Sequence, residues 1–214
     1  MLLKRIITVA LSLTMATNLF ADNWKLKKTD DDLGIKVYVR DVTGSPLKEF
    51  KGVTNLKSTL NSSVALISDT ENLPNWIYNM LSIEVLEKVN EHETYAYSVN
   101  KTGPFMDNRD SVVYSVLMQD PASKVVTITL EGKPAYIPPS DDAVRVASLK
   151  GLWQFTPNNN GTVEVVYQLH VDPSARLPQS MINRFIVRSS LETLAEMHKQ
   201  IEKYQNKNLA YIME

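Results

Sequence analysis

The chain places many short β-type segments before one long amphipathic segment, and few folds are compatible with this order. Its apolar residues come in short bursts from Val85 to Asp172 and then take helical spacing from Pro178 to about Asn206. A period of two is typical of strands, and a period of 3.6 is typical of a helix. We therefore expect an α+β fold in which a curved antiparallel sheet of about nine strands surrounds the C-terminal helix and encloses a hydrophobic cavity.

Turn residues separate the expected elements. Asn61 is expected to cap a helix that runs to residue 69, and Pro74 to stand in the first turn of a second helix that ends near Leu81. Strands are predicted at residues 24–28, 35–40, 48–55, 83–89, 94–100, 110–119, 125–131, 144–155 and 162–171. In the final helix one face is formed by Ile182, Phe185, Ile186, Leu191, Leu194, His198 and Ile201.

Residues 1–21 have the order of a secretory signal peptide. Two basic residues precede the apolar run 6–16, and Ala21 ends a small-residue cleavage motif. The run is shorter than the roughly 20 apolar residues of a membrane-spanning helix. We expect cleavage after Ala21 and a periplasmic protein, with cleavage after Ala16 and an uncleaved anchor as the alternatives.

The composition limits the function of the remaining chain, which we divide into a domain over residues 22–208 and a tail over 209–214. The formal net charge is −1 for the full chain and −3 without the two basic residues of the signal peptide, and no dense basic segment is present. Both observations argue against nucleic-acid binding. The chain has no cysteine, which excludes disulfides, a thiol nucleophile and a lipid-modified cysteine.

No recognisable set of catalytic residues or metal ligands is encoded. His92, His170 and His198 have no second histidine or carboxylate at metal-ligand spacing, and the three aspartates from Asp30 to Asp32 lack the spacing of a calcium loop. Phosphate-loop, dinucleotide and nucleophile-elbow motifs are also absent from the sequence. We therefore predict no enzyme activity, metal or cofactor. An acid–base pair that only the fold brings together is the alternative.

Two arginines near predicted strands are candidate polar site residues. Arg109 and Asp110 open a strand that continues as an apolar run. A guanidinium that faces the interior needs a carboxylate or a ligand oxygen, because an unpaired buried charge is costly. Arg145 is a second candidate, although a solvent-facing position explains it equally well. Aromatic residues that line either a cavity or the core are Trp76, Tyr97, Trp153, Phe155, Tyr167 and Phe185.

Several motifs, read in order, resemble the START family of steroidogenic acute regulatory protein-related lipid-transfer domains. The resemblance covers nearly all of the chain after residue 21. Residues 24–26, 34–40 and 48–52 resemble its first three strands, and the later matching motifs are Arg109-Asp110, Gly151-Leu152-Trp153-Gln154-Phe155-Thr156-Pro157, Val166-Tyr167, Asp172-Pro173, Leu177-Pro178 and Asn183.

The resemblance implies a helix-grip fold and a single bound lipid or other hydrophobic molecule in an internal tunnel, with transient contact to a membrane surface. Some sterol-binding members carry an arginine where this chain has Ser115. The candidate ligand-binding residues are Arg109, Trp76, Tyr97, Ser115, Trp153, Tyr167 and Phe185.

Three questions stay open at this point. Arg109 is expected either to hold a ligand oxygen or to form a structural ion pair. Residues 132–142 and 172–177 are the expected lids, because a closed tunnel needs a moving element to admit its ligand. An aromatase/cyclase-type enzyme on the same scaffold and a partner-binding module without a ligand are the alternative functions.

Overall fold

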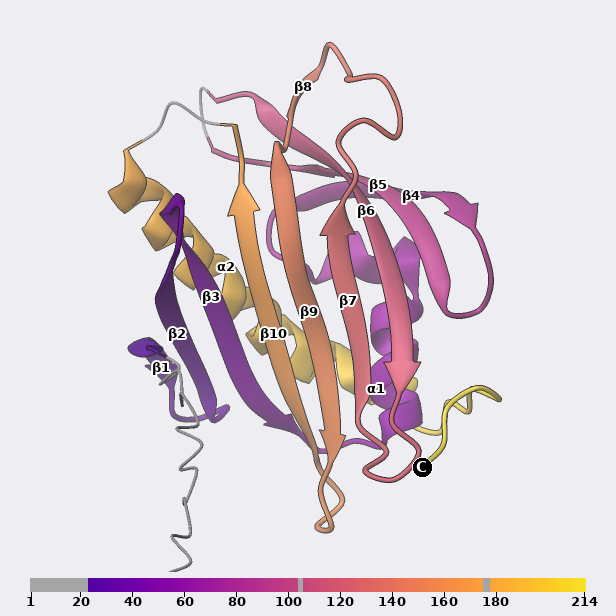
Figure 1. The fold of residues 1–214 in the computed structure, drawn as a ribbon. Coiled ribbons are helices and arrows are strands. Elements are labelled where there is room, and N and C mark those ends of the chain that lie inside the picture. The colour runs from indigo at the N-terminus through magenta and orange to yellow at the C-terminus, as the bar shows by residue number, and fades with distance from the viewer. Residues whose placement is uncertain (1–22, 104–105, 175–177) are drawn as a thin grey trace, which may run out of the picture.

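Ten strands form one sheet in the computed structural model, which describes residues 23–103, 106–174 and 178–214 (Figure 1). The strand order is β1-β2-β3-β10-β9-β7-β6-β5-β4, and these neighbours are antiparallel, whereas β8 pairs with β6 in parallel. The predicted antiparallel sheet of about nine strands is confirmed. The bounds are β1 Lys25–Asp30, β2 Ile35–Val42, β3 Ser45–Leu56, β4 Met80–Lys88, β5 Glu93–Asn100, β6 Asn108–Gln119, β7 Val126–Gly132, β8 Ala143–Arg145, β9 Ser148–Pro157 and β10 Val163–Asp172.

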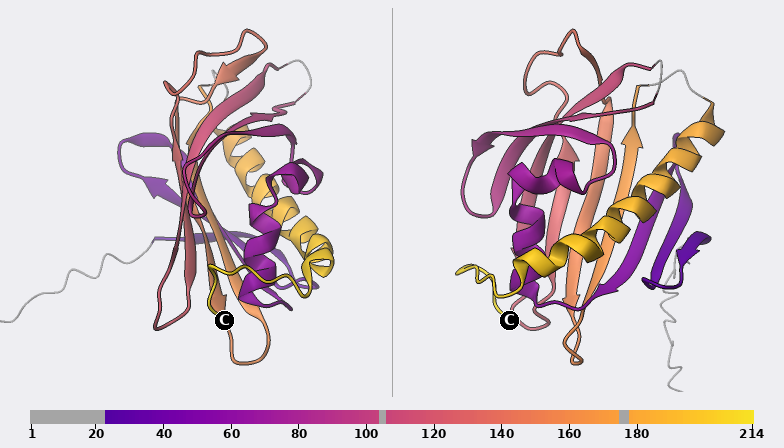
Figure 2. Two further views of the ribbon diagram at one scale, coloured as in Figure 1. Left: turned by 90° about the vertical axis from the view of Figure 1, so that its right-hand side faces the viewer. Right: turned by 180° about the vertical axis from the view of Figure 1, so that it is seen from behind.

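The helices lie together on the concave face of the sheet, and the longest crosses it diagonally (Figure 2). They are α1 (Leu60–Ser68), the 3₁₀ helix η1 (Thr70–Asn75), α2 (Gln179–Gln200) and the 3₁₀ helix η2 (Ile201–Tyr204). Helix α2 packs against β1, β2 and β3, while η1 packs against β4 at the opposite edge of the sheet. The predicted long C-terminal helix is confirmed.

Helix α2 approaches β3 closely because Gly52 has no side chain. A Cβ atom at this position would lie 2.4 Å from Ser190 Oγ and 2.6 Å from Leu194 Cδ1. Leu194 and Met197, on the same helix face, are fully buried. The grip of the helix on this half of the sheet therefore depends on direct contact between helix side chains and strand backbone.

Two of the predicted secondary-structure elements differ from the structure. Residues 74–81 are not a helix: Pro74 lies inside η1, and Asn79, with a φ of 60°, turns the chain into β4. The single strand predicted at residues 144–155 is divided into β8 and β9. The cap of α1 also differs from expectation, because the Thr59 side chain, rather than that of Asn61, accepts from the backbone N–H of Ser62 at 3.1 Å.

The segment at residues 209–214 packs onto the domain. The Glu214 carboxylate accepts hydrogen bonds from the backbone N–H groups of Leu60 and Asn61 at 3.2 and 2.7 Å. These groups lie in the first turn of α1, where backbone donors have no partner within the helix. Ile212 is buried in the core. The segment thus completes the start of α1.

Candidate functional site

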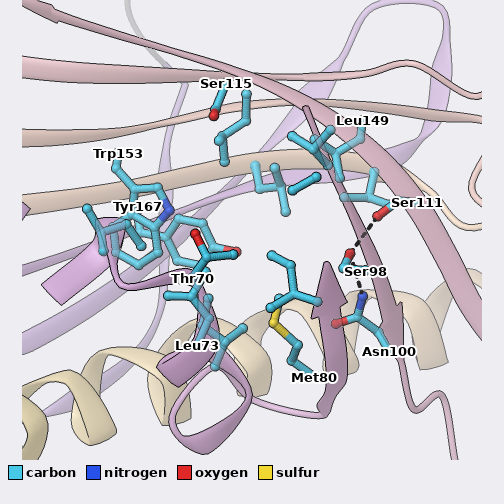
Figure 3. Close-up of a pocket in the computed structure, with 18 of the residues that line it drawn as sticks. Thr70, Leu73, Met80, Ser98, Asn100, Ser111, Ser115, Leu149, Trp153 and Tyr167 are labelled. Carbon is cyan, nitrogen blue, oxygen red and sulfur yellow. Dashed lines mark hydrogen bonds between the residues drawn. The ribbon is translucent and has the colours of Figure 1, made fainter. Parts of the chain in front are cut away.

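A cavity of about 790 Å³ lies between the concave face of the sheet and the helices (Figure 3). Its wall is formed by side chains from β4 to β7, β9 and β10, and its cover by residues of η1 and α2. This volume is within the range of sites that hold one small organic ligand. This cavity is therefore the candidate ligand site.

One part of the wall is apolar and aromatic. Trp153 on β9 and Tyr167 on β10 are cross-strand partners, and their rings stack with centroids 3.9 Å apart. Burial raises the pKa of the Tyr167 hydroxyl, which is therefore neutral at physiological pH. Leu149 and Leu169, on the same two strands, and Leu130 on the neighbouring β7 extend this surface. It offers contact to hydrocarbon rather than to a charged group.

The wall formed by β5 and β6 is more polar. Alternate residues of a strand face the same side, so the cavity receives a ladder of cross-strand pairs. The pairs, all of which line the cavity, are Thr94 with Ser115, Ala96 with Val113, Ser98 with Ser111 and Asn100 with Arg109. Sequence analysis missed most of these residues; the signal was a run of small side chains at every second position of both strands.

Arg109 lies at the start of β6 and ties it to the segment before α2. Its Nε donates to the Pro173 carbonyl at 2.6 Å, and its Nη1 donates to the Asp107 carbonyl at 2.6 Å. Within the described ranges it forms no ion pair with a carboxylate. The structural partner is therefore backbone rather than the expected carboxylate. Arg109 also lines the cavity, so ligand contact stays a prediction.

Asp110, the next residue, faces away from the cavity and pairs with Arg145. Asp110 is fully buried and the Arg145 side chain is 9% exposed, so the solvent-facing interpretation of Arg145 was wrong. Arg145 Nε and Nη2 donate to the two carboxylate oxygens at 3.1 and 3.0 Å. Its Nη1 donates to the carbonyls of Pro134 and Ile137 at 2.7 and 3.0 Å.

Through these hydrogen bonds Arg145 holds the loop at residues 132–142 on the outside of the sheet. Tyr136 of that loop stacks on Tyr95, an outward-facing residue of β5, at 4.3 Å. In the described chain no residue from 132 to 142 lines the cavity. The loop expected to act as a lid thus does not cover the cavity, and of the second expected lid, residues 175–177 lie outside the described residues.

The structure brings five of the seven candidate residues to the cavity wall. Trp76 and Tyr97 do not line it. Trp76 is buried behind Trp153, with the two rings edge to face at 6.2 Å. Tyr97 faces the outside of the sheet, where burial and the nearby Asp110 carboxylate raise its pKa. The five lining residues are Arg109, Ser115, Trp153, Tyr167 and Phe185.

One opening of the cavity, called the mouth below, lies beside the first turns of α2. Met181 and Phe185 line the cavity and are nevertheless 42% and 36% exposed. Thr102, Met106 and Pro173 line the same end. An apolar ligand that enters here meets apolar side chains before it reaches the interior.

The described residues contain no group of three or more histidine, cysteine, aspartate or glutamate residues arranged to hold a metal ion. None of their helices combines the length and apolar character needed to cross a membrane.

Comparisons with known proteins agree with the fold. The START domain family model matches residues 10–207. An uncharacterised Pseudomonas aeruginosa protein is 31% identical over 203 residues, which cover 94% of this chain and 98% of that protein.

Two solved structures have the same fold. The crystal structure of a STAR-related lipid transfer protein from Xanthomonas axonopodis has a TM-score of 0.76 and 32% identity, with 85% of this chain and 99% of that chain covered. Human StAR-related lipid transfer protein 5 has a TM-score of 0.77 at 17% identity, with 86% and 88% covered. Because the family model and these relatives span nearly the whole chain, the protein belongs to the START domain family.

Proposed function

We propose that this protein carries a single lipid or other hydrophobic molecule in its internal cavity and is not an enzyme. The observation that carries the proposal is the 790 Å³ cavity, which has a continuous apolar wall around Trp153 and Tyr167. Burial of a hydrocarbon chain there gains about 0.8 kcal/mol per methylene group. A few polar contacts are then enough to orient the ligand.

The membrane is the proposed source and destination of the ligand. Met181, Arg184, Phe185 and Arg188 are exposed and recur at helical spacing, so they share one outer face of α2 at the cavity mouth. A face with both apolar and cationic side chains suits the boundary of an anionic bilayer. Transient contact through this face would place the mouth against lipid.

Export is part of the proposal. The basic, apolar and small-residue order of positions 1–21 supports a signal peptide that is removed after Ala21. The periplasmic fraction should contain a form whose N-terminal residue is Asp22, as intact-mass measurement would show. Full-length protein in the inner membrane would contradict export and support the anchor.

Native mass spectrometry tests the carrier function. The wild-type protein should carry a mass excess that organic extraction identifies as one lipid or hydrophobic molecule. Ala96 faces the cavity and Ala122 lies in an exposed turn, so Ala96→Phe should remove the excess while Ala122→Phe keeps it. Wild-type protein without excess mass in every preparation, and without uptake of added lipid, would favour the partner-binding module.

A further inference from the structure

Ser98, Asn100 and Ser111 form a polar cluster in the cavity wall that the packing of the sheet does not require. Ser98 and Ser111 are each only 5% exposed, and the cluster lies beside the apolar side chains of Met80 and Leu149 (Figure 3). Alanine or valine at these positions would fit the same strands. Polar side chains in such a place need hydrogen-bond partners, because leaving them unpaired is unfavourable.

The cluster satisfies only part of its own hydrogen-bonding capacity. Ser98 Oγ and Ser111 Oγ share one hydrogen bond of 3.0 Å, and Asn100 Nδ2 donates to Ser98 Oγ at 3.4 Å. Two hydroxyls and one amide contain four polar hydrogens, of which these two bonds use two. The Asn100 carbonyl oxygen is a further acceptor. The cluster can therefore both donate to and accept from a ligand.

The cluster itself carries no charge, and two guanidinium nitrogens of the neighbouring Arg109 are directed at backbone carbonyls. Arg109 is the cross-strand partner of Asn100, but its Nε and Nη1 donate to the backbone carbonyls of Pro173 and Asp107. In return for its lost hydration, an anionic group seated on Ser98 and Ser111 would meet only neutral donors there, which is unfavourable in a low-dielectric interior. Arg109 is the neighbouring cation that would have to turn towards such a group. A neutral oxygen group meets no such cost.

We propose that Ser98, Asn100 and Ser111 bind an uncharged oxygen group of the ligand, such as a hydroxyl, ketone or ester carbonyl. This inference rests on the proposed carrier function and specifies its ligand class: neutral lipids with such a group are preferred over anionic amphiphiles. A hydroxyl fits best, since it can donate to the Asn100 carbonyl oxygen and accept from a serine or the amide.

Displacement of the neutral fluorescent probe N-phenyl-1-naphthylamine tests this with three twelve-carbon compounds: 1-dodecanol, 1-dodecene and dodecanoate. Because the compounds differ in their transfer free energy from water, each is compared between protein variants. Ser98→Ala/Ser111→Ala removes both partners of one hydrogen bond and leaves only the long 3.4 Å bond from Asn100 without its acceptor, so the effect on folding should be small. It should weaken 1-dodecanol about tenfold and change 1-dodecene less than twofold.

The matched control is Ser58→Ala/Ser63→Ala, another buried serine pair, whose hydroxyls are 3.2 Å apart and which does not line the cavity. It should leave both affinities unchanged. Asn100→Leu is a second test of the cluster and should weaken 1-dodecanol without affecting 1-dodecene. Thermal unfolding of each variant shows that the protein is folded.

The possible outcomes distinguish failure of this inference from failure of the proposed carrier function. If the wild type binds the probe but 1-dodecanol is unaffected by both cluster variants, the inference is wrong and the carrier function stands. If dodecanoate displaces the probe at lower concentrations than 1-dodecanol and Arg109→Leu abolishes this, the ligand group is anionic and the inference is again overturned. If the wild type binds neither probe nor compounds, both proposals fail.

Discussion

Replacement of Arg145 by methionine should cost about 3–5 kcal/mol of unfolding free energy, the usual range when one partner of a buried ion pair is removed. Asp110 is fully buried and would keep its carboxylate without the guanidinium that now donates to both of its oxygens. The carbonyls of Pro134 and Ile137 would lose a donor as well. Methionine has a similar length, so loss of volume contributes little.

For a domain of this size, 1 kcal/mol shifts the melting temperature by about 2–4 °C, so the expected fall is roughly 6–20 °C. Circular dichroism measures the fall, and hydrogen exchange locates it. Amides at residues 133–142 should lose protection in the variant, because Arg145 connects this loop to β6. Amides of α2, on the other side of the sheet, should keep theirs.

Lys199→Met is the control, because Lys199 pairs with Glu196 at 2.6 Å on the exposed surface of α2. Exposed pairs contribute about 0–1 kcal/mol, so its melting temperature should move by only a few degrees. Equal shifts for Arg145→Met and Lys199→Met would refute the assignment of a buried, structural ion pair. Unchanged exchange in the loop would refute its tethering by Arg145.

Two further predictions concern Arg109 and His198. Arg109→Leu leaves the carbonyls of Pro173 and Asp107 without their donor. It should therefore lower the free energy of unfolding by about 1–3 kcal/mol without changing the affinity for 1-dodecanol. A specific loss of affinity at constant melting temperature would instead assign Arg109 to the ligand. Burial lowers the pKa of His198, although Asp30 opposes the shift. Protonation of His198 therefore favours the unfolded protein. The stability of the folded state should be unaffected by this histidine above the unfolded-state pKa of about 6.5 and should decline as the pH falls below that value. Guanidinium unfolding at pH 7.5 and 5.5 should show a larger acid loss for the wild type than for His198→Gln, and equal losses would contradict this.

The sequence predicted the sheet and the long helix because their hydrophobic periods extend over many residues. The strand at 35–40 was found within β2, where Ile35, Val37 and Val39 are buried at every second position. The helix predicted at residues 74–81 was wrong because a proline near a helix start is equally compatible with a 3₁₀ turn. The positive φ of Asn79 also could not be predicted, since a single asparagine does not reliably indicate that conformation. Local preferences of this kind are decided by the packing of η1 on β4.

The candidate site was harder to predict because sequence reasoning looked for large side chains. In β5 the tyrosines Tyr95 and Tyr97 share one face and Ala96 and Ser98 share the other, and the strand period alone does not say which face is inward. The structure turns the tyrosines outward, where Tyr114 and Tyr136 stack on Tyr95. Large inward side chains would have filled the cavity, so a hollow wall requires the small residues.

The small polar residues of this wall help to explain how the protein stays folded with so large a cavity when no ligand is bound. At about 24 cal/mol per Å³, a dry void of 790 Å³ would cost roughly 19 kcal/mol, more than the whole stability of a typical domain. The unloaded protein must therefore contract or admit water, and water needs polar partners to be retained in a cavity. Ser98, Asn100 and Ser111 supply such partners on one wall. When a ligand hydroxyl replaces that water, the hydrogen bonds are exchanged rather than lost, while the opposite wall gains hydrocarbon contact. The same polar cluster would then lower the free energy of the ligand-free protein and also favour a ligand that carries a hydroxyl group.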